Sequence, residues 1–104
     1  MGSVRVVRPA VYILASKRNG TLYIGVTGDL AARISIHKQE LVESFTERYD
    51  VHRLVHFEHF ETMPDAISRE KRLKKLRRAE KLALIEASNP NWLDLTQDIQ
   101  AWRE

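Results

Sequence analysis

The chain has 104 residues, with 17 Lys or Arg, 14 Asp or Glu, and a formal net charge of +3 when histidine is neutral. This length suits a single domain with one hydrophobic core and excludes a second domain with its own core. The chain has no cysteine, which excludes disulfides, thiolate metal sites and a thiol nucleophile. It also lacks a bilayer-spanning apolar run and a secretory signal, so we expect a cytoplasmic protein without membrane contact.

Two short runs rich in Val, Ile, Leu and Tyr, 10–13 and 22–25, lie on either side of Asn19 and Gly20. Asn and Gly tolerate the positive φ of a tight primed turn, so the pattern predicts a β-hairpin with these two residues in the turn. In this register Ser16 faces Tyr23 and Leu14 faces Gly25.

Alternation along the two strands separates two faces of the hairpin. One face is wholly aliphatic and is predicted to be the core side; it carries Val11, Ile13, Ala15, Leu22, Ile24 and Val26. The other face carries Tyr12 and Tyr23, with Gly25 leaving a gap beside them. Glycine within a strand often marks a close approach of a ligand or of another backbone. Either this face binds something, or the tyrosines pack under a helix with their hydroxyls at its rim.

The segment 30–41 predicts a helix capped by Asp29 or Thr27. Its buried stripe comprises Leu30, Ile34 and Leu41. Arg33 and His37 are four residues apart, so they lie one turn apart on the same side of this helix and can act on one ligand. The polar segment 42–49 predicts a loop or a short helix.

Residues 51–60 predict a third strand whose imperfect alternation favours helices on both of its faces. Thr62 and Asp65 predict the start of a long helix near Met63, and a second helix follows over 78–87. The expected inward residues of these helices are Ala66, Ile67, Leu73, Leu76, Leu82, Leu84 and Ile85.

The tail after Asn89-Pro90 carries Trp92, Leu93 and Leu95 and is expected to pack back on the domain. The predicted fold class is α+β: a small, mostly antiparallel three-stranded sheet, made of the hairpin and a strand near 52–60, flanked by helices in one domain.

Glu70 lies on or beside the inward stripe of the long helix, so its carboxylate needs a partner, and Lys74 at the i+4 position is one candidate. Eight cations surround it within thirteen residues: Arg69, Lys71, Arg72, Lys74, Lys75, Arg77, Arg78 and Lys81. Such a concentration is typical of a partner rich in phosphate, although surface helices also carry Lys and Arg for solubility.

The order of these features resembles the GIY-YIG nuclease domain: Val11-Tyr12-Ile13, then Tyr23-Ile24-Gly25, then Arg33 with His37 a turn later, then Glu70 in a basic helix. The chain looks most like the small single-domain group related to the N-terminal domain of an excision-repair nuclease. The resemblance covers residues 9–95, with an N-terminal extension over 1–8 and a C-terminal tail over 96–104. Ala10 and Val11 stand where the family name implies Gly and Ile.

The resemblance implies a bacterial, divalent-metal-dependent endonuclease that hydrolyses phosphodiester bonds of DNA, structure-specific and related to repair. DNA is expected as the substrate more than RNA, and a larger repair or recognition protein is a further partner. By the same resemblance Glu70 would hold one Mg²⁺ or Mn²⁺, Arg33 would contact the scissile phosphate and Tyr23 would hydrogen-bond it. Tyr12 would accept a proton from the attacking water or orient that water. His37 is the competing base, because its unperturbed pKa lies near ~6.5.

The residues expected to contact nucleic acid are Gly25, Lys71, Lys74, Lys75, Arg77, Arg78 and Asn91. One alternative function is a non-catalytic nucleic-acid-binding module that uses the basic helix 69–81. Another is an adaptor that docks through an exposed Trp92 and Trp102. A zinc site formed by the strand histidines is not expected, since neither Cys nor a suitably spaced carboxylate accompanies them. The sequence leaves the oligomeric state open.

Overall fold

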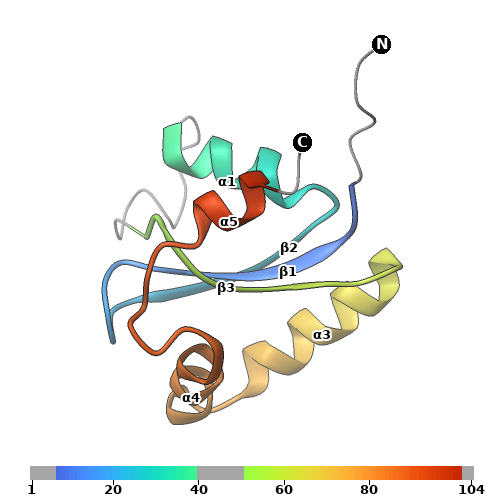
Figure 1. Cartoon of the computed structure of the whole chain (residues 1–104). Helices are drawn as coiled ribbons and strands as arrows, with labels where there is room; N and C mark the ends of the chain where they lie inside the picture. Colours follow the sequence, from blue (N-terminus) through green and yellow to red (C-terminus); the bar gives the residue numbers. More distant parts are fainter. Residues whose placement is uncertain (1–6, 40–50, 102–104) are drawn as a thin grey trace.

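The computed structural model describes residues 7–39 and 51–101, apart from the side chains of 37–39 and 99–101. Its elements are β1 (Ala10–Ala15), β2 (Leu22–Thr27), α1 (Leu30–Gln39), β3 (Arg53–His59), α3 (Met63–Lys75), α4 (Arg78–Ser88) and α5 (Thr96–Ala101). The three strands form one antiparallel sheet in the order β2-β1-β3. Helices α1 and α5 lie on one face of the sheet and α3 and α4 on the other (Figure 1). The predicted α+β fold is confirmed.

The hairpin forms as predicted, but its register differs by two residues. Leu14 pairs with Tyr23 and Tyr12 with Gly25. Asn19 takes the positive φ, 58°, and the backbone N–H of Gly20 donates to the carbonyl of Lys17. The turn therefore centres one residue earlier than predicted. Since the side-chain period of a strand is two, a shift of two preserves which residues share a face.

The sheet has a hydrophobic core on each face, whereas only the aliphatic face of the hairpin was predicted to be a core side. The expected core face packs against α3 and α4; its buried residues include Val11, Ile13, Ala15, Ile24, Val55, Ala66, Leu73 and Ile85. On the other face, Tyr12 and Leu14 pack with Leu30 and Ile34 of α1. Tyr12 is only 2% exposed. The tyrosine face is thus itself largely buried under a helix.

An irregularity in β3 explains why its sequence does not alternate cleanly. Ile13 pairs with His56 but Leu14 pairs with Leu54, so Val55 is an extra residue in the ladder. A β-bulge of this kind changes which side chains share a face. Val55 accordingly packs toward α3 and α4, whereas Leu54 and Phe57 pack with the α1 core. Strict alternation along 51–60 would place Val55 and Phe57 on one face, and the bulge separates them.

The predicted helix starts are largely confirmed. The carboxylate of Asp29 accepts a hydrogen bond from the backbone N–H of Ala32 at 3.2 Å and so caps α1. Thr62 caps α3 by accepting from Asp65 N–H at 3.3 Å. Ile67, however, is 36% exposed instead of inward-facing.

The segment after α4 packs back on the domain around Trp92, whose side chain is 0% exposed. The indole Nε1 of Trp92 donates to Glu86 at 2.8 Å, and Leu95 N–H donates to the carbonyl of Leu54. Leu93 is 61% exposed and does not join the core. An adaptor surface that includes an exposed Trp92 is therefore wrong. The predicted burial of Leu41, the predicted loop or short helix over 42–49 and the predicted exposure of Trp102 lie outside the described residues.

Among residues 7–39 and 51–101, no helix combines the length and the apolar character needed to cross a membrane.

Candidate active site at the edge of the sheet

Tyr12 and Tyr23 project from adjacent strands on the same face of the sheet. Their ring centroids are 6.2 Å apart and the rings are tilted by 39°. The central strand β1 carries Tyr12 and buries its ring, whereas Tyr23 on the edge strand β2 is only partly buried. The two phenol side chains are hydrogen-bonded to each other.

Gly25 provides the space in which the Tyr12 phenol lies. A Cβ atom added at Gly25 would stand 2.5 Å from both Cζ and Oη of Tyr12. Any larger residue at Gly25 would therefore overlap the Tyr12 ring. The gap expected from the sequence is occupied by the neighbouring tyrosine, and the predicted contact of Gly25 with nucleic acid remains a prediction.

Arg33 approaches this pair from the first turn of α1, where its side chain is exposed. Its charge lowers the pKa of Tyr12, which means that the guanidinium lies within electrostatic reach of the phenol. The Asp29 cap and the burial of Leu30 and Ile34 against the sheet fix the position of this turn. His37 is in the same helix, but its side chain lies outside the described residues.

Glu70 approaches from α3, which packs against the opposite face of β1 and β2. Its side chain is 16% exposed, and Oε2 lies 3.5 Å from Nζ of Lys74, the ion pair expected from the sequence. The carboxylate also acts on Tyr12, because its charge contributes to raising the pKa of that phenol. Tyr23, Arg33 and Glu70, from β2, α1 and α3, thus each act on the phenol of Tyr12.

The environment of Tyr12 strongly favours its protonated form. Burial is the largest cause, the charge of Tyr23 is the next, and together with the smaller effects they raise the pKa of Tyr12 above its ordinary value of 10, despite the opposing charge of Arg33. At neutral pH the Tyr12 phenol is consequently a hydrogen-bond donor.

The donor set at this site fits a weakly held divalent ion better than a preformed metal cage. In the described part of the chain, no cluster of three or more His, Cys, Asp or Glu side chains is arranged to hold a metal. Mg²⁺ commonly binds through one or two carboxylates, with water and substrate phosphate completing its octahedral shell. Glu70 supplies one carboxylate, and its lysine partner is 55% exposed and able to move away.

The basic residues expected to contact nucleic acid lie at the surface of α3 and at the start of α4. Lys71, Lys74, Lys75 and Arg77 are exposed. The guanidinium of Arg78 donates to the carbonyls of Asn19 and Gly20, at 2.7 and 2.6 Å, and thereby ties α4 to the hairpin turn. Arg78 thus has a structural role that its place in a basic run did not indicate.

Asn91 is exposed in the turn after α4, whereas its neighbour Asn89 is 3% exposed. The amide of Asn89 donates to the carbonyls of Val55 and Leu93 and accepts from Leu93 N–H. Asn89 therefore holds this turn against β3. The contact of Asn91 with nucleic acid remains a prediction.

An ion network that the sequence reasoning missed connects β3 to α3. Glu58 accepts hydrogen bonds from Nε and Nη2 of Arg69, at 2.9 and 3.1 Å, and from Nε2 of His56 at 2.7 Å. The hydrogen bond from His56, followed by that from Arg69, lowers the pKa of Glu58 to about 2 despite partial burial. Arg69 is therefore engaged within the fold, although it belongs to the basic run.

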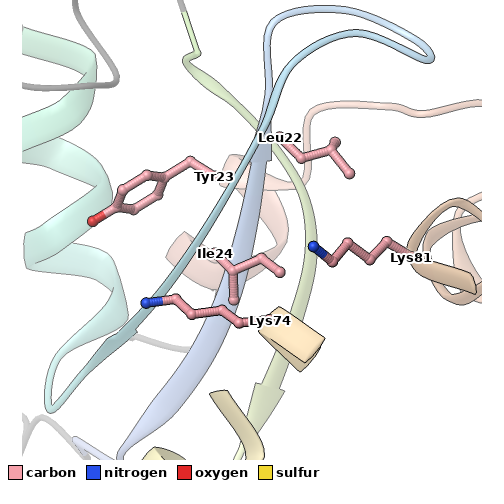
Figure 2. Close-up of a pocket in the computed structure, with 5 residues that line it drawn as sticks. All are labelled: Leu22, Tyr23, Ile24, Lys74 and Lys81. Atoms are coloured by element: carbon pink, nitrogen blue, oxygen red, sulfur yellow. The ribbon is translucent and has the colours of Figure 1, made fainter. Parts of the chain in front are cut away.

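A groove of about 280 Å³ lies beside β2, lined by Leu22, Tyr23, Ile24, Lys74 and Lys81. Figure 2 shows the two lysines extending toward β2 from the helices, while the Tyr23 ring points away from Leu22 and Ile24 toward the other side of the strand. In the sequence, Lys81 is only one of eight clustered cations. Its position follows from the break between α3 and α4, after which Arg78 ties the start of α4 to the hairpin turn.

Comparisons with known proteins identify the family and the fold of the chain. Residues 8–83 match the model of the family described as the GIY-YIG catalytic domain. A UPF0213 protein of Clostridium perfringens is 40% identical over 79 residues, which are 76% of this chain and 84% of that protein. A UPF0213 protein of Halobacterium salinarum is 35% identical over 75 residues, 72% of this chain and 96% of that protein. The solution NMR structure of a UPF0213 protein from Bacillus halodurans is similar with a TM-score of 0.54 and 28% identity, over 86% of this chain and 95% of that one.

Proposed function

Because the chain belongs to the GIY-YIG catalytic-domain family, a family of nucleases, we propose that it hydrolyses phosphodiester bonds in DNA with the help of one divalent metal ion. The observation that carries the proposal is the pair of tyrosine rings, with centroids 6.2 Å apart, together with the effect of the charges of Arg33 and Glu70 on the pKa of Tyr12. The four residues of the proposed site come from β1, β2, α1 and α3, which are distant parts of the sequence.

Each side chain has a role suited to its chemistry. Arg33 is exposed and carries a planar fork of N–H donors, which matches two oxygens of the scissile phosphate. Tyr23, at the edge of the sheet, donates a hydrogen bond to the phosphate or to its neighbour. Glu70 would hold Mg²⁺ or Mn²⁺, which supplies charge stabilisation at the phosphoryl oxygens and a more acidic water when bound.

Tyr12 orients the attacking water in this proposal, because burial and Tyr23 raise the pKa of its phenol and keep it protonated in the free protein. Tyr12 can accept a proton from the water only after additional positive charge near the phenol has lowered its pKa and the phenol has ionised. His37 is the alternative base, with an unperturbed pKa near ~6.5 that needs no such change.

A non-catalytic nucleic-acid-binding module is the second candidate. The ion pair between Glu70 and Lys74 favours it, because a carboxylate neutralised by lysine is the arrangement expected on an ordinary basic helix. Binding to nucleic acid without turnover would then depend on the cations of α3 and α4.

The two functions are separated by incubating the purified protein with single-stranded, duplex, nicked and branched DNA, and with RNA of the same sequences, in Mg²⁺, Mn²⁺ or EDTA. The nuclease proposal predicts cleavage that needs the metal and that Glu70→Gln abolishes. Glu61→Gln is the matched control, because Glu61 is exposed before α3 and should leave cleavage unchanged. Cleavage that is equal in wild type and Glu70→Gln would reject the proposed site, and salt-sensitive binding without any cleavage would favour the binding module.

A further inference from the structure

The groove beside β2 lies next to the proposed active site but uses different chemistry. Leu22 and Ile24 contribute an aliphatic wall that packs on the core facing α3 and α4. Lys74 and Lys81 add two ammonium groups, and none of the described residues that line the groove is acidic. An apolar wall beside two positive charges suits an anion with an apolar body better than a free inorganic ion, which has no apolar part to bury.

The volume of the groove limits the ligand to a small unit. At about 280 Å³ it lies near the lower end of the ~300–1,000 Å³ typical of small-molecule sites. This space suits one nucleotide, with the sugar and base against Leu22 and Ile24 and the phosphate near the two ammonium groups. A base pair of an intact duplex is too large for it.

The groove and the proposed active site share two residues. Tyr23 lines the groove from strand β2 while its phenol lies on the other side of the strand with Tyr12, and Lys74 lines the groove and pairs with Glu70 at 3.5 Å. Strand β2 is an outer strand of the sheet, so the chain of a nucleic acid can pass along its edge from one side to the other. A phosphate in the groove would also compete with Glu70 for the ammonium group of Lys74.

We propose that this groove holds one unpaired nucleotide flanking the cleaved linkage, with its phosphate between Lys74 and Lys81 and its sugar and base against Leu22 and Ile24. The position beside the cleaved linkage rests on the proposed function, but the binding of a nucleotide does not. The groove therefore selects a substrate that is single-stranded on one side of the cut.

The test is the salt dependence of binding to a fluorescein-labelled oligodeoxythymidine, followed by fluorescence anisotropy in EDTA so that no cleavage occurs. Losing one phosphate contact to a single strand lowers the slope of log K against log salt by ~0.7 and weakens binding about threefold to tenfold near 50 mM salt. Lys81→Gln should show both changes, and Lys81→Arg should restore most of the affinity.

Two further variants make the test specific. Arg72→Gln removes the same charge from the exposed surface of α3 outside the groove and should change affinity and slope less than Lys81→Gln. Leu22→Ala should weaken binding while leaving the slope unchanged, because it removes apolar contact and no charge. Thermal unfolding of each variant establishes that it is folded at the temperature of the assay.

The proposal is overturned if Lys81→Gln binds like wild type, or if Arg72→Gln loses as much affinity and slope as Lys81→Gln, which would indicate diffuse attraction to the whole basic surface. A duplex that binds as tightly as the single strand at equal salt would also overturn it. Cleavage that persists in Lys81→Gln with unchanged binding would reject the groove and leave the nuclease proposal intact. Binding that depends on Lys81, without any metal-dependent cleavage, would reject the nuclease proposal and leave the groove as a nucleotide-binding site.

Discussion

Gly25→Ala is the substitution that most sharply tests how the sheet positions Tyr12. The added methyl group would stand 2.5 Å from Cζ and Oη of the phenol, and ordinary contact begins at 3.4 Å, so the ring must move by about 0.9 Å. Tyr12 is 2% exposed and lies in a closely packed core, which leaves no adjacent space to absorb that movement. The added methyl group therefore displaces the hydroxyl group of Tyr12 from its position.

The expected magnitudes follow from this displacement. Forcing an extra carbon into a packed site costs about 1–3 kcal/mol, whereas Ala in a strand gains only roughly 0.5–1 kcal/mol over Gly. We expect a net loss of about 1–2 kcal/mol in the free energy of unfolding, which lowers the melting temperature by roughly 4–16 °C for a domain of this size. A misplacement of ~1 Å at a reacting group costs on the order of 10²-fold in rate.

The assay compares single-turnover cleavage and thermal unfolding of Gly25→Ala with those of Gly28→Ala, in which the added methyl group meets nothing within 4 Å. Both rates are measured well below the lower melting temperature. The reasoning is refuted if Gly25→Ala is as stable and as fast as Gly28→Ala, because the Tyr12 phenol would then not depend on the space at Gly25.

Three further predictions concern protonation and packing. Absorbance titration of the tyrosines should show one phenol ionising well above pH 10, because burial raises the pKa of Tyr12, and Tyr12→Phe should remove that step. In the wild-type protein the free energy of unfolding should fall as pH rises past 10, because Tyr12 ionises there more readily in the unfolded chain than in the folded one. Glu58→Gln should destabilise the protein by about 1–2 kcal/mol in urea at neutral pH. The difference should shrink as pH falls from 4.5 to about 2, because the unfolded wild-type chain binds a proton at Glu58 in this range while the folded chain, in which the pKa of Glu58 is about 2, does not. Arg78→Ala should cost about 0.5–1.5 kcal/mol and speed hydrogen exchange of the hairpin turn, with Arg72→Ala showing neither effect.

The fold class was predictable from the sequence because its signals are local. Asn19 marks a turn, Thr62 and Asp65 mark a helix start, and Pro90 follows a helix end. Alternation then assigned the hairpin side chains to the correct faces even though the register was wrong. Asn can occupy either central position of a tight turn, so the sequence alone did not determine which pair of residues forms it.

The misassigned positions depend on tertiary geometry. The buried positions Ala66 and Leu73 of α3 are seven residues apart, and Glu70 lies between them on the same stripe, whereas Ile67 is rotated by about 100° toward solvent. Helical periodicity alone does not say how wide the buried stripe is. The bulge at Val55 likewise depends on the partner strand.

The candidate site was partly predictable. The residue types and their order indicated which side chains to consider, but their relative positions depend on the packing of α1 and α3 on opposite faces of the sheet. The structural roles of Arg78 and Asn89 and the position of Lys81 in a groove were not predictable, because each depends on contacts between elements distant in sequence.

The most direct test of the central claim, that these side chains act as one metal-dependent site, is a double-mutant cycle on the rate of DNA cleavage in Mg²⁺. It compares wild type, Tyr12→Phe, Glu70→Gln and the double variant. Residues that act as one unit give strongly non-additive losses, so we expect the double variant to be no slower than the slower single variant. Losses that multiply, or four equal rates, would contradict a single site built from Tyr12 and Glu70.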